Sequence, residues 1–543
     1  MLALAGAAWV LYGSVLQLWW THDDFFLLRA LLTRRPYWYF VSASDYHEMP
    51  PGLLTPLLFF SLDADRRLFG IDPHPFYLHQ LAAVSLCIAV LYGVARLWLS
   101  RVWAAVAAWI FLVGPVTASM ASLVMVRHYV EATTLALLSI AAWAGALRQC
   151  LGAAAWRRAC LSAALYFAAC VTKEIAVPLV ALLPLLPSPD RRGGFRERVR
   201  LALPHVVAVA VYLALRYAVL GTLFGAYGFA VRPSDLPALG LELPGKIARE
   251  FVGGHLSSAA VGFALALAAG VATIFIASSG RRAAAFALLL AMLPVLPVST
   301  RMEPRYAMPA WIVVAVAFAL GCRTLAAAEN RARWRNAAVV IAVVACASGL
   351  WLNRQDWRVR FATLERMSAE NRFVLEMKEG DVLRQPLTLA ASLLELTAVF
   401  QRPHGGRWFQ DDLFLCLHGD PLGRVWGYDP AARRVIDLTK RIPDLRDGHC
   451  ASIRADAPLR ARFHVAGHDL FWELGPYRSG TYRFVLDDGG SVFEMPRSGG
   501  FQMRGRPALP ALRVGYESPE GWVTYSPAFQ LGFVDGWTLA WSR

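Results

Sequence analysis

The chain has 543 residues, of which 57% are hydrophobic and only 17% charged, and its formal net charge is +15. Because an ordinary soluble domain carries about 25% charged residues, this composition argues against a soluble protein and predicts a polytopic membrane protein. Most of the arginines gather in short segments between apolar runs. That placement is typical of cytoplasmic loops and argues against a nucleic-acid partner.

Residues 1–20 form an apolar run without a single charge. The run has no basic segment at its start and no small-residue cleavage site before His22, so we predict a retained membrane helix rather than a signal peptide. An acidic pair, Asp23-Asp24, follows almost at once. Ionisable groups at the margin of a bilayer usually mark a substrate or ion path. Alternatively, Asp23 caps the next helix and Asp24 lies in its first turn, so the pair alone leaves both interpretations open.

About eleven membrane helices are predicted from apolar runs that approach the roughly 20 residues needed to cross a bilayer. The runs are residues 1–20, 76–99, 102–120, 123–147, 159–171, 175–186, 201–220, 256–278, 283–298, 307–322 and 337–352. The fifth and sixth runs are short, and Lys173-Glu174 separates them.

Basic residues in the short connections predict the topology. They form four clusters, which are Arg148, Arg157 and Arg158; Arg191, Arg192, Arg196, Arg198 and Arg200; Arg281 and Arg282; and Arg323, Arg331, Arg333 and Arg335. All four fall on one side if the runs alternate across the bilayer, and the positive-inside rule makes that side cytoplasmic. The opposite side then receives residues 22–75, Arg127-His128, Lys173-Glu174, residues 221–254, residues 301–306 and the C-terminal part.

Two connections on the predicted outer side are long. In the first, residues 25–32 predict a short amphipathic helix, residues 37–40 an aromatic belt at the membrane interface, and residues 51–62 a second apolar helix. The second, residues 221–254, is rich in glycine and proline and is predicted to form a mobile cover.

The composition changes beyond Trp351. We predict a membrane domain over residues 1–353, an amphipathic linking helix over residues 354–380, and a β-rich, sandwich-like domain over residues 381–543. Two alternating runs, residues 425–428 and 435–438, flank a turn-like segment and predict a hairpin. The last segment has roughly 160 residues, which is enough to bury a core of its own.

The eight cysteines divide into two groups. If the C-terminal part lies outside the cytoplasm, Cys416 and Cys450 can form a disulfide. The others lie in or beside apolar runs and are predicted to be buried small hydrophobes, namely Cys87, Cys150, Cys160, Cys170, Cys322 and Cys346.

Several polar groups fall on the predicted outer face. A carboxylate at Asp23 or Asp24 can serve as a general base or bind a divalent cation. Glu48, just before Pro50-Pro51, contacts either substrate or solvent. Arg127, near Glu131, forms an ion pair with that residue or acts directly on a ligand. Lys173 and Glu174 likewise either neutralise charges within the protein or act directly on a ligand. Arg305 presents a planar fork suited to phosphate oxygens, or else extends to the membrane surface.

The sequence contains no P-loop, no dinucleotide fingerprint and no zinc-type spacing, so a cytoplasmic nucleotide substrate is not supported. Carboxylates and arginines at an outer membrane face suit a lipid-linked phosphate. The residues resemble the GT-C superfamily of membrane glycosyltransferases, which includes protein O-mannosyltransferases and aminoarabinose transferases. The similar segments are Asp23-Asp24, Glu48-Met49-Pro50-Pro51-Gly52, Val171-Thr172-Lys173-Glu174 and Pro304-Arg305-Tyr306-Ala307-Met308-Pro309. Gly52 departs from the leucine that is usual in the family.

This resemblance implies an inverting transfer of a sugar from a polyprenyl phosphate-linked donor to a lipid, glycan or protein acceptor on the periplasmic face of a bacterial inner membrane. Asp23 would be the base, and Asp24 would support it or bind a metal. Arg305 would hold the donor phosphate. The other substrate-binding residues that the resemblance implies are His22, Glu48, Arg127, His128, Lys173, Glu174, Arg301 and Tyr306. The C-terminal domain would contact the acceptor.

Two other functions are consistent with the same residues. A transporter or flippase of a lipid-linked sugar would bury its charged groups near the bilayer midplane. A membrane scaffold with a partner-binding tail would have no cavity shared by these charged residues.

Overall fold

The computed structural model describes residues 2–22, 24–44, 54–149, 152–186, 194–223, 236–252, 257–277, 287, 292, 295, 303–327, 331–401, 406–419, 423–467, 469–486, 492–502, 511–532 and 534–542. The chain forms two compact units. Unit 1 comprises Met1–Gln17, Arg34–Gly225 and Pro237–Phe361, and unit 2 comprises Leu18–Thr33, Ala226–Leu236 and Ala362–Arg543. The predicted domain limits at residues 353 and 380 remain predictions.

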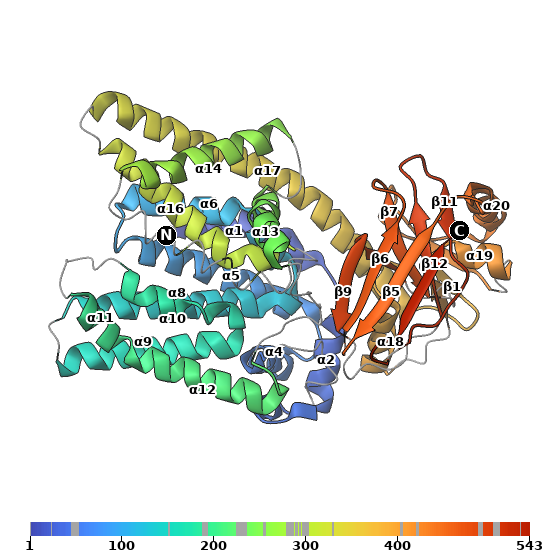
Figure 1. Ribbon diagram of the computed structural model, residues 1–543, viewed down its shortest axis with the longest axis horizontal. Helices are drawn as coiled ribbons and strands as arrows, with labels where there is room; N and C mark the ends of the chain where they lie inside the picture. The colour runs from blue at the N-terminus through green and yellow to red at the C-terminus, as the bar shows by residue number, and fades with distance from the viewer. Residues whose placement is uncertain are drawn as a thin grey trace. The chain divides into compact units, whose positions relative to one another are not determined.

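Unit 1 is helical (Figure 1). Its α-helices are α1 (Leu2–Tyr12), α4 (Pro56–Phe69), α5 (Pro73–Ala95), α6 (Arg101–Val113), α7 (Pro115–Ser122), α8 (Arg127–Leu147), α9 (Ala153–Thr172), α10 (Leu179–Leu182), α11 (Phe195–Leu201), α12 (Leu203–Leu220), α13 (Leu236–Phe251), α14 (Ser258–Ala277), α16 (Met308–Ala326) and the first part of α17 (Arg331–Val374). Its short 3₁₀ helices are η1 (Gly13–Gln17), η2 (Pro36–Phe40), η3 (Val124–Val126), η4 (Glu174–Ala176), η5 (Leu183–Leu185) and η8 (Pro304–Ala307).

Five helices in the described residues are long and apolar enough to cross a membrane, or six if one bent pair is a single span. They are Pro73–Ala95, Val124–Leu147, Leu203–Leu220, Pro304–Ala326 and Ala332–Val374, and the bent pair is Arg101–Val113 with Pro115–Ser122. The predicted number of eleven is therefore not confirmed. Several predicted runs form shorter helices, and the run at residues 283–298 lies almost entirely outside the described residues.

The bent pair has a local cause. α6 and α7 meet at 59° where Pro115, which has no backbone N–H, ends the first hydrogen-bond ladder. The Trp311 ring packs against this break and donates a hydrogen bond of 3.1 Å to the Phe111 carbonyl. A Cβ at Gly114 would lie 2.4 Å from that ring, so only glycine fits here.

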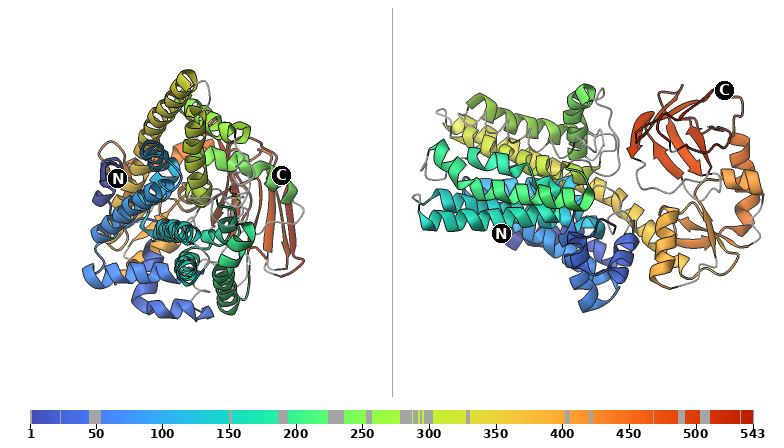
Figure 2. Two further views of the ribbon diagram at one scale, coloured as in Figure 1. Left: turned by 90° about the vertical axis from the view of Figure 1, so that its left-hand side faces the viewer. Right: turned by 60° about the horizontal axis from the view of Figure 1, so that its bottom comes forward.

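Small residues let the helices of unit 1 approach closely. α8 and α9 pair as an antiparallel hairpin, and α12 packs beside α9 (Figures 1 and 2). Alanines such as Ala146, Ala155 and Ala159 lie in the α8–α9 interface around Trp143. Large apolar side chains point outward, for example Leu161 on α9 and Val207 on α12, as expected of surfaces that face lipid.

Three local predictions in the long connections had different outcomes. The short helix predicted at residues 25–32 is confirmed as α2 (Asp24–Thr33), which belongs to unit 2. The second apolar helix begins later than predicted, at Pro56. The region predicted as a mobile cover contains helix α13, whose polar face carries an ion pair between Lys246 and Glu242, so the prediction of a loop there was wrong.

Helix α17 has 44 residues and begins in unit 1 and ends in unit 2. The last predicted span and the linking helix predicted at residues 354–380 are thus parts of one helix, which ends at Val374. The apolar composition of its first part and the charged composition of its second part suggested two helices. Backbone hydrogen bonding continues through that change, because no proline or glycine interrupts residues 350–374.

Unit 2 contains a mixed sheet followed by a sandwich. The sheet has strands β1 (Val382–Arg384), β2 (Arg407–Phe409), β3 (Val425–Asp429) and β4 (Arg434–Asp437) in the order β2-β1-β3-β4. β1 pairs in parallel with β2 and β3, whereas β3 and β4 form the predicted antiparallel hairpin. The helices around it are α18 (Ala390–Val399), α19 (Leu413–His418), η9 (Thr439–Arg441) and α20 (Ile442–Ser452). This α/β part was not predicted.

The sandwich confirms the prediction for the rest of the C-terminal part. Its strands are β5 (Arg460–Ala466), β6 (Asp469–Gly475), β7 (Thr481–Leu486), β8 (Val492–Met495), β9 (Ser498–Gln502), β10 (Leu512–Glu517), β11 (Val523–Tyr525) and β12 (Thr538–Ser542). They form two sheets, β11-β10-β7-β8 and β12-β5-β6-β9. One apolar core joins the sheets, with Phe463 and Trp472 from one and Phe484 and Val514 from the other.

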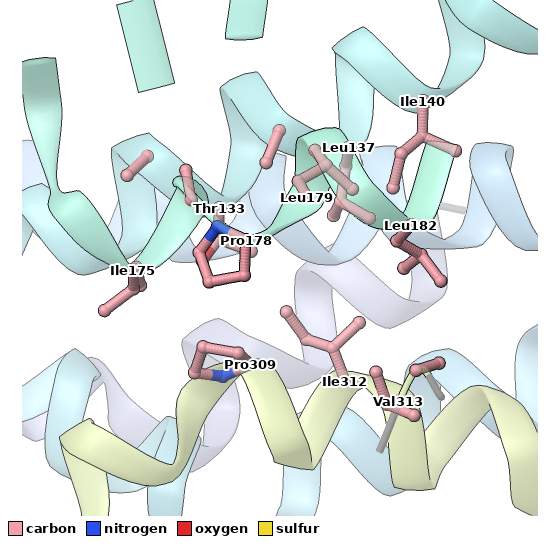
Figure 3. A pocket seen from close by; sticks show the side chains of 14 residues that line it. Thr133, Leu137, Ile140, Ile175, Pro178, Leu179, Leu182, Pro309, Ile312 and Val313 are labelled. Carbon is pink, nitrogen blue, oxygen red and sulfur yellow. The ribbon is translucent and has the colours of Figure 1, made fainter. Parts of the chain in front are cut away.

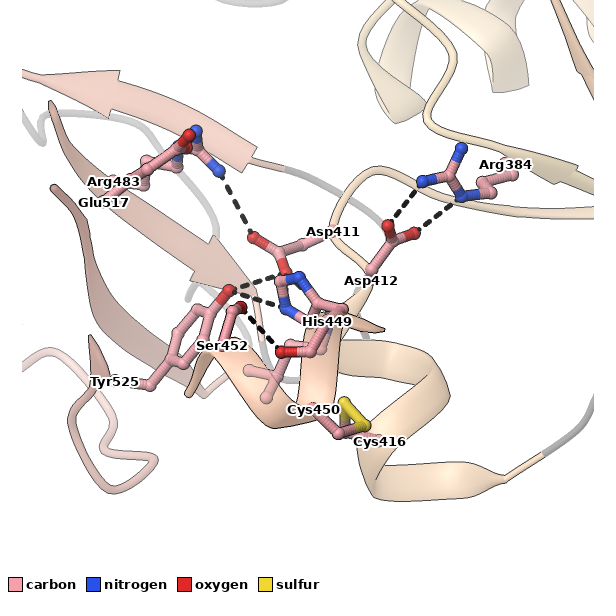
Figure 4. Close-up of polar contacts among 11 residues, drawn as sticks. Arg384, Asp411, Asp412, Cys416, His449, Cys450, Ser452, Arg483, Glu517 and Tyr525 are labelled. Carbon is pink, nitrogen blue, oxygen red and sulfur yellow. Dashed lines mark hydrogen bonds and ion pairs between the residues drawn. A yellow bond between two sulfur atoms is a disulfide. The ribbon is translucent and has the colours of Figure 1, made fainter. Parts of the chain in front are cut away.

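A polar junction links the mixed sheet to the sandwich (Figure 4). The Asp411 carboxylate, which follows β2, accepts hydrogen bonds from the Tyr525 hydroxyl at 2.9 Å and the Leu413 backbone N–H at 2.8 Å. Burial and the neighbouring Asp411 carboxylate raise the pKa of Tyr525, which therefore stays a hydrogen-bond donor. His449 lies 3.7 Å from the same carboxylate.

The cysteine predictions are largely confirmed. Cys416 and Cys450 form a disulfide that joins α19 to α20 (Figure 4). Cys87, Cys170 and Cys322 are buried, as predicted, and Cys346 is half-buried. Cys160 is exposed on α9, which corrects the prediction, since its side chain lies on the outer surface of the helix rather than in the helical core. Cys150 lies outside the described residues.

Candidate functional site

The start of α8 carries Arg127, whose guanidinium is completely buried. It donates to the Asp65 carboxylate at 2.5 Å, to the Phe76 carbonyl at 2.7 Å and, more weakly, to Ser61 at 3.4 Å. His79 lies 3.1 Å from the same guanidinium nitrogen. These residues come from α4, α5 and α8, so the Arg127 cluster ties three helices together.

The partner of Arg127 is not the one weighed from sequence. Glu131 accepts a hydrogen bond of 2.5 Å from Ser61 and reaches Arg127 only through that hydroxyl. The direct ion pair is with Asp65 on α4, a residue that the sequence analysis did not single out. In the sequence, Arg66 and Arg67 follow Asp65, a pattern typical of the exposed end of a helix. Nothing in the sequence indicates that the partner of Asp65 lies 62 residues away.

Lys173 and Glu174 lie where the chain breaks between α9 and η4, as their position between two apolar runs predicted. Lys173 is extended and its side chain is 1% exposed. Its ammonium lies 4.8 Å from the centre of the Tyr129 ring and 3.9 Å from the Glu174 carboxylate. Burial lowers the pKa of Lys173 to about 8, and the nearby Glu174 charge opposes this shift.

Arg305 and Tyr306 lie in η8, just before α16. The Arg305 side chain is only 13% exposed, so it does not extend to the membrane surface. It pairs with Glu303 at 2.6 Å and lies over the Tyr306 ring. The charges of Lys173 and Arg305 both act on His128, which places the three residues in one neighbourhood, here called the Lys173–Arg305 cluster together with Glu174, Tyr129 and Tyr306.

The cluster also contains a residue that sequence reasoning missed. Arg216 lies inside the apolar helix α12, is 3% exposed, and its charge acts on Lys173. A signal was present, since a single arginine inside an apolar run is costly unless it faces a partner or a ligand. The run was interpreted only as a span, and this signal was overlooked.

Unit 1 contains an apolar cavity of about 120 Å³ between α8, α16 and the segment that follows Glu174 (Figure 3). Pro309, Ile312 and Val313 of α16 face Ile175, Pro178 and Leu179 across it. α8 supplies a third wall, with Thr133, Ala136 and Leu137. Ile175 and Ala176, which line the cavity, directly follow Glu174 in the sequence, and Pro309 follows Arg305 by four residues, so the lining and the charged groups lie on neighbouring parts of the chain.

The described part of the acidic stretch belongs to unit 2. Asp24, the first residue of α2, is 2% exposed, and its carboxylate accepts a hydrogen bond of 3.0 Å from the Thr21 backbone N–H. This hydrogen bond between a side chain and the backbone three residues earlier fixes the turn that leads into α2. Between them, His22 has a positive φ of 48°, a backbone conformation that non-glycine residues rarely adopt.

Helix α17 holds this stretch in place. The Trp19 backbone N–H donates to Ser368 at 2.7 Å, and the buried Asn371 amide donates to the Trp20 carbonyl at 3.0 Å. Two buried polar side chains are thus devoted to the backbone just before the acidic pair. Such anchoring is expected where a loop must present a side chain in a fixed position.

The predicted residues are distributed as follows. Unit 1 contains Arg127, His128, Lys173, Glu174, Arg305 and Tyr306, and all except Arg127 lie in the Lys173–Arg305 cluster. Unit 2 contains His22 and Asp24. Asp23, Glu48 and Arg301 lie outside the described residues. No group of three or more metal-ligating side chains occurs in the described residues, so the proposed divalent cation at Asp23 and Asp24 stays a prediction.

Two solved structures illustrate what the chain is similar to. One is ArnT from Cupriavidus metallidurans bound to undecaprenyl phosphate, with 16% identity, 79% of this chain and 93% of that chain covered, and a TM-score of 0.42. The other is the oligosaccharyltransferase AglB from Archaeoglobus fulgidus with an inhibitory peptide and dolichol phosphate, with 11% identity, 91% and 74% covered, and a TM-score of 0.43. No family model and no curated protein matches the chain. With TM-scores below 0.5, these likenesses do not decide its function.

Proposed function

We propose that the chain is a membrane glycosyltransferase that takes a sugar from a polyprenyl phosphate-linked donor. The observation that carries this proposal is the apolar cavity whose lining includes Ile175, directly after Glu174, and Pro309, four residues after Arg305. An isoprenoid tail needs an apolar space, and its phosphate needs buried cations at the mouth of that space. Within unit 1 the cavity lining lies on parts of the chain that neighbour Lys173 and Arg305, and the sequence resemblance described above points to the same donor.

The phosphate is held by Lys173, Arg216 and Arg305 in this proposal. Lys173 and Arg216 are buried and Arg305 is largely buried, and the Glu174 and Glu303 carboxylates lie close to them. Clustered cations of this kind bind the oxygens of a phosphodiester. A guanidinium has five N–H donors in a planar fork, so Arg305 can keep its Glu303 partner and bind phosphate oxygens at once.

Asp23 acts as the general base. Its neighbour Asp24 is buried and accepts a hydrogen bond from the Thr21 backbone, so Asp24 supports the loop and leaves proton transfer to Asp23. Asp23 removes the proton from an acceptor hydroxyl or amine as that atom bonds to the anomeric carbon. The bond from this carbon to the phosphate oxygen breaks, and its electron pair leaves with polyprenyl phosphate.

The reaction is placed at the periplasmic face of a bacterial inner membrane. The basic clusters at the α8–α9 turn support this orientation. Arg148 follows the end of α8, and Arg157 and Arg158 lie in the first turns of α9, at the opposite end of the hairpin from Lys173. Basic residues remain preferentially on the cytoplasmic side. Unit 2 then lies outside the cytoplasm, where the disulfide between Cys416 and Cys450 is stable.

The test uses the full chain in lipid vesicles with a polyprenyl phosphate-linked sugar, and membranes from cells that lack the protein supply the acceptor. Release of polyprenyl phosphate and incorporation of the sugar are measured together. The wild-type chain should produce both, and Asp23→Asn should abolish both while it still binds polyprenyl phosphate. Movement of intact donor across the vesicle membrane without sugar transfer would instead support a flippase.

A further inference from the structure

Glu174 is a buried carboxylate that lacks hydrogen-bond donors. Both of its carboxylate oxygens are inaccessible to solvent, and neither accepts a hydrogen bond from any residue that the structure describes. The closest cation is Lys173, whose ammonium is 3.9 Å away, beyond hydrogen-bonding distance, and is turned toward the Tyr129 ring. The pair therefore does not neutralise itself through a hydrogen-bonded contact.

A carboxylate in this state is costly. Leaving one buried polar acceptor without a donor costs about 1–3 kcal/mol, and more for a charged group. Such groups are uncommon in folded proteins, and each calls for an explanation. Arg127 differs from Glu174, because its buried guanidinium donates hydrogen bonds to the Asp65 carboxylate and to the Phe76 carbonyl.

A ligand that binds the Glu174 carboxylate must donate hydrogen bonds to its oxygens. A carboxylate repels phosphate, so the phosphate of a donor lipid lies on Lys173 and Arg305 and not on Glu174. The isoprenoid tail of the donor lipid lies in the apolar cavity that Ile175 helps to line. The remaining part of a lipid-linked sugar is the sugar itself, which carries hydroxyl groups and in some cases an amino group, and these are the donors that a carboxylate accepts.

We propose that Glu174 recognises the sugar of the donor lipid by accepting hydrogen bonds from a hydroxyl or amino group next to the phosphate. This inference rests on the proposed function, because it takes the lipid phosphate to lie on Lys173 and Arg305. In this inference, Glu174 enables the protein to distinguish a polyprenyl phosphate that carries a sugar from one that does not. Glu174 is thus a specificity residue, and Lys173 is the phosphate ligand beside it.

The experiment measures binding of two probes to the full chain in detergent by native mass spectrometry. One probe is polyprenyl phosphate, and the other is the same lipid carrying a neutral hexose or an amino sugar. The variant is Glu174→Gln, which keeps the shape of the side chain. The control is Glu242→Gln, a change in an exposed ion pair on α13.

The expected result is a loss for one probe only. Glu174→Gln should weaken binding of at least one sugar-bearing lipid about 10- to 100-fold, the value for one hydrogen bond to a charged group. Binding of bare polyprenyl phosphate should be retained or slightly strengthened, which also shows that the variant is folded. Glu242→Gln should leave both affinities unchanged.

Two outcomes overturn the inference in different ways. If the wild-type chain binds both lipids, and Glu174→Gln weakens the binding of both equally or of neither, then Glu174 does not recognise the sugar. The proposed function would stand in that case. If the wild-type chain binds neither lipid, the proposed function fails and this inference fails with it.

Discussion

Two charged clusters at the same end of the helices of unit 1 differ in how their hydrogen bonds are used. In the Arg127 cluster, the guanidinium bonds to a carboxylate, a hydroxyl and a backbone carbonyl on two other helices. In the Lys173–Arg305 cluster, the Glu174 carboxylate has no donor among the described residues, and the next residue, Ile175, lines an apolar cavity. We therefore propose a structural role for the Arg127 cluster and a ligand-binding role for the Lys173–Arg305 cluster.

This difference separates residues that looked alike in the sequence. Arg127 and Arg305 are both arginines that begin apolar helices, and both were candidate substrate ligands. The structure connects Arg127 to α4 and α5 through its hydrogen bonds, whereas Arg305 forms an ion pair with Glu303, two residues away.

The largest expected effect is on stability, from Arg127→Met. This change leaves Asp65 buried without its cation, and breaking one side of a buried ion pair costs about 3–5 kcal/mol. The measurement is thermal unfolding of the purified chain in detergent. A variant with an unchanged melting temperature would show that Arg127 is not the structural joint described here.

Arg305→Lys sharpens the comparison, because it keeps the charge and removes the planar fork. We expect transfer to fall about 10- to 100-fold, as for the loss of a charge-assisted hydrogen bond, with little change in melting temperature. The matched control is Arg127→Lys, which should lower the melting temperature. If both lysine variants lost stability to the same extent, the distinction between the two clusters would be wrong.

A smaller effect is expected from filling the cavity. Ala136→Phe places a ring among Leu137, Pro178 and Ile312 and should weaken binding of a long-chain polyprenyl phosphate about tenfold, the affinity equivalent of roughly 1.4 kcal/mol. Binding of a short-chain isoprenoid phosphate should change less. Leu138→Phe, on the exposed face of the same helix, is the control. Equal weakening of both chain lengths would show that the tail does not occupy this space.

Local signals in the sequence predicted much of the fold. The short helix after the acidic pair, the break at Lys173-Glu174, the hairpin of β3 and β4, the disulfide and the sandwich all depend on residues close in sequence or on alternating patterns. The mixed sheet was missed because its strands β1 and β2 have only three residues each. Helix α13 was not predicted because its glycines and prolines are typical of a loop.

The site was only partly predictable for a physical reason. The motifs identified Lys173, Glu174 and Arg305, but not which polar groups are already bonded. Asp65 pairs with Arg127 across 62 residues, and Asp24 bonds to the backbone of Thr21, so each candidate's role depends on contacts that the sequence pattern does not contain. The hydrogen bonds of Arg127 to Asp65 and Phe76 distinguish it from Glu174, which accepts none from the described residues.

The central claim is that the chain transfers a sugar from a lipid-linked donor with Asp23 as the base. The most direct measurement is mass spectrometry of lipid-linked sugars and surface glycans from cells that make either the wild-type chain or Asp23→Asn at equal membrane levels. The account predicts that the variant cells accumulate the sugar-bearing polyprenyl phosphate and lack one sugar in their glycans. Identical lipid and glycan profiles in the two strains would contradict it.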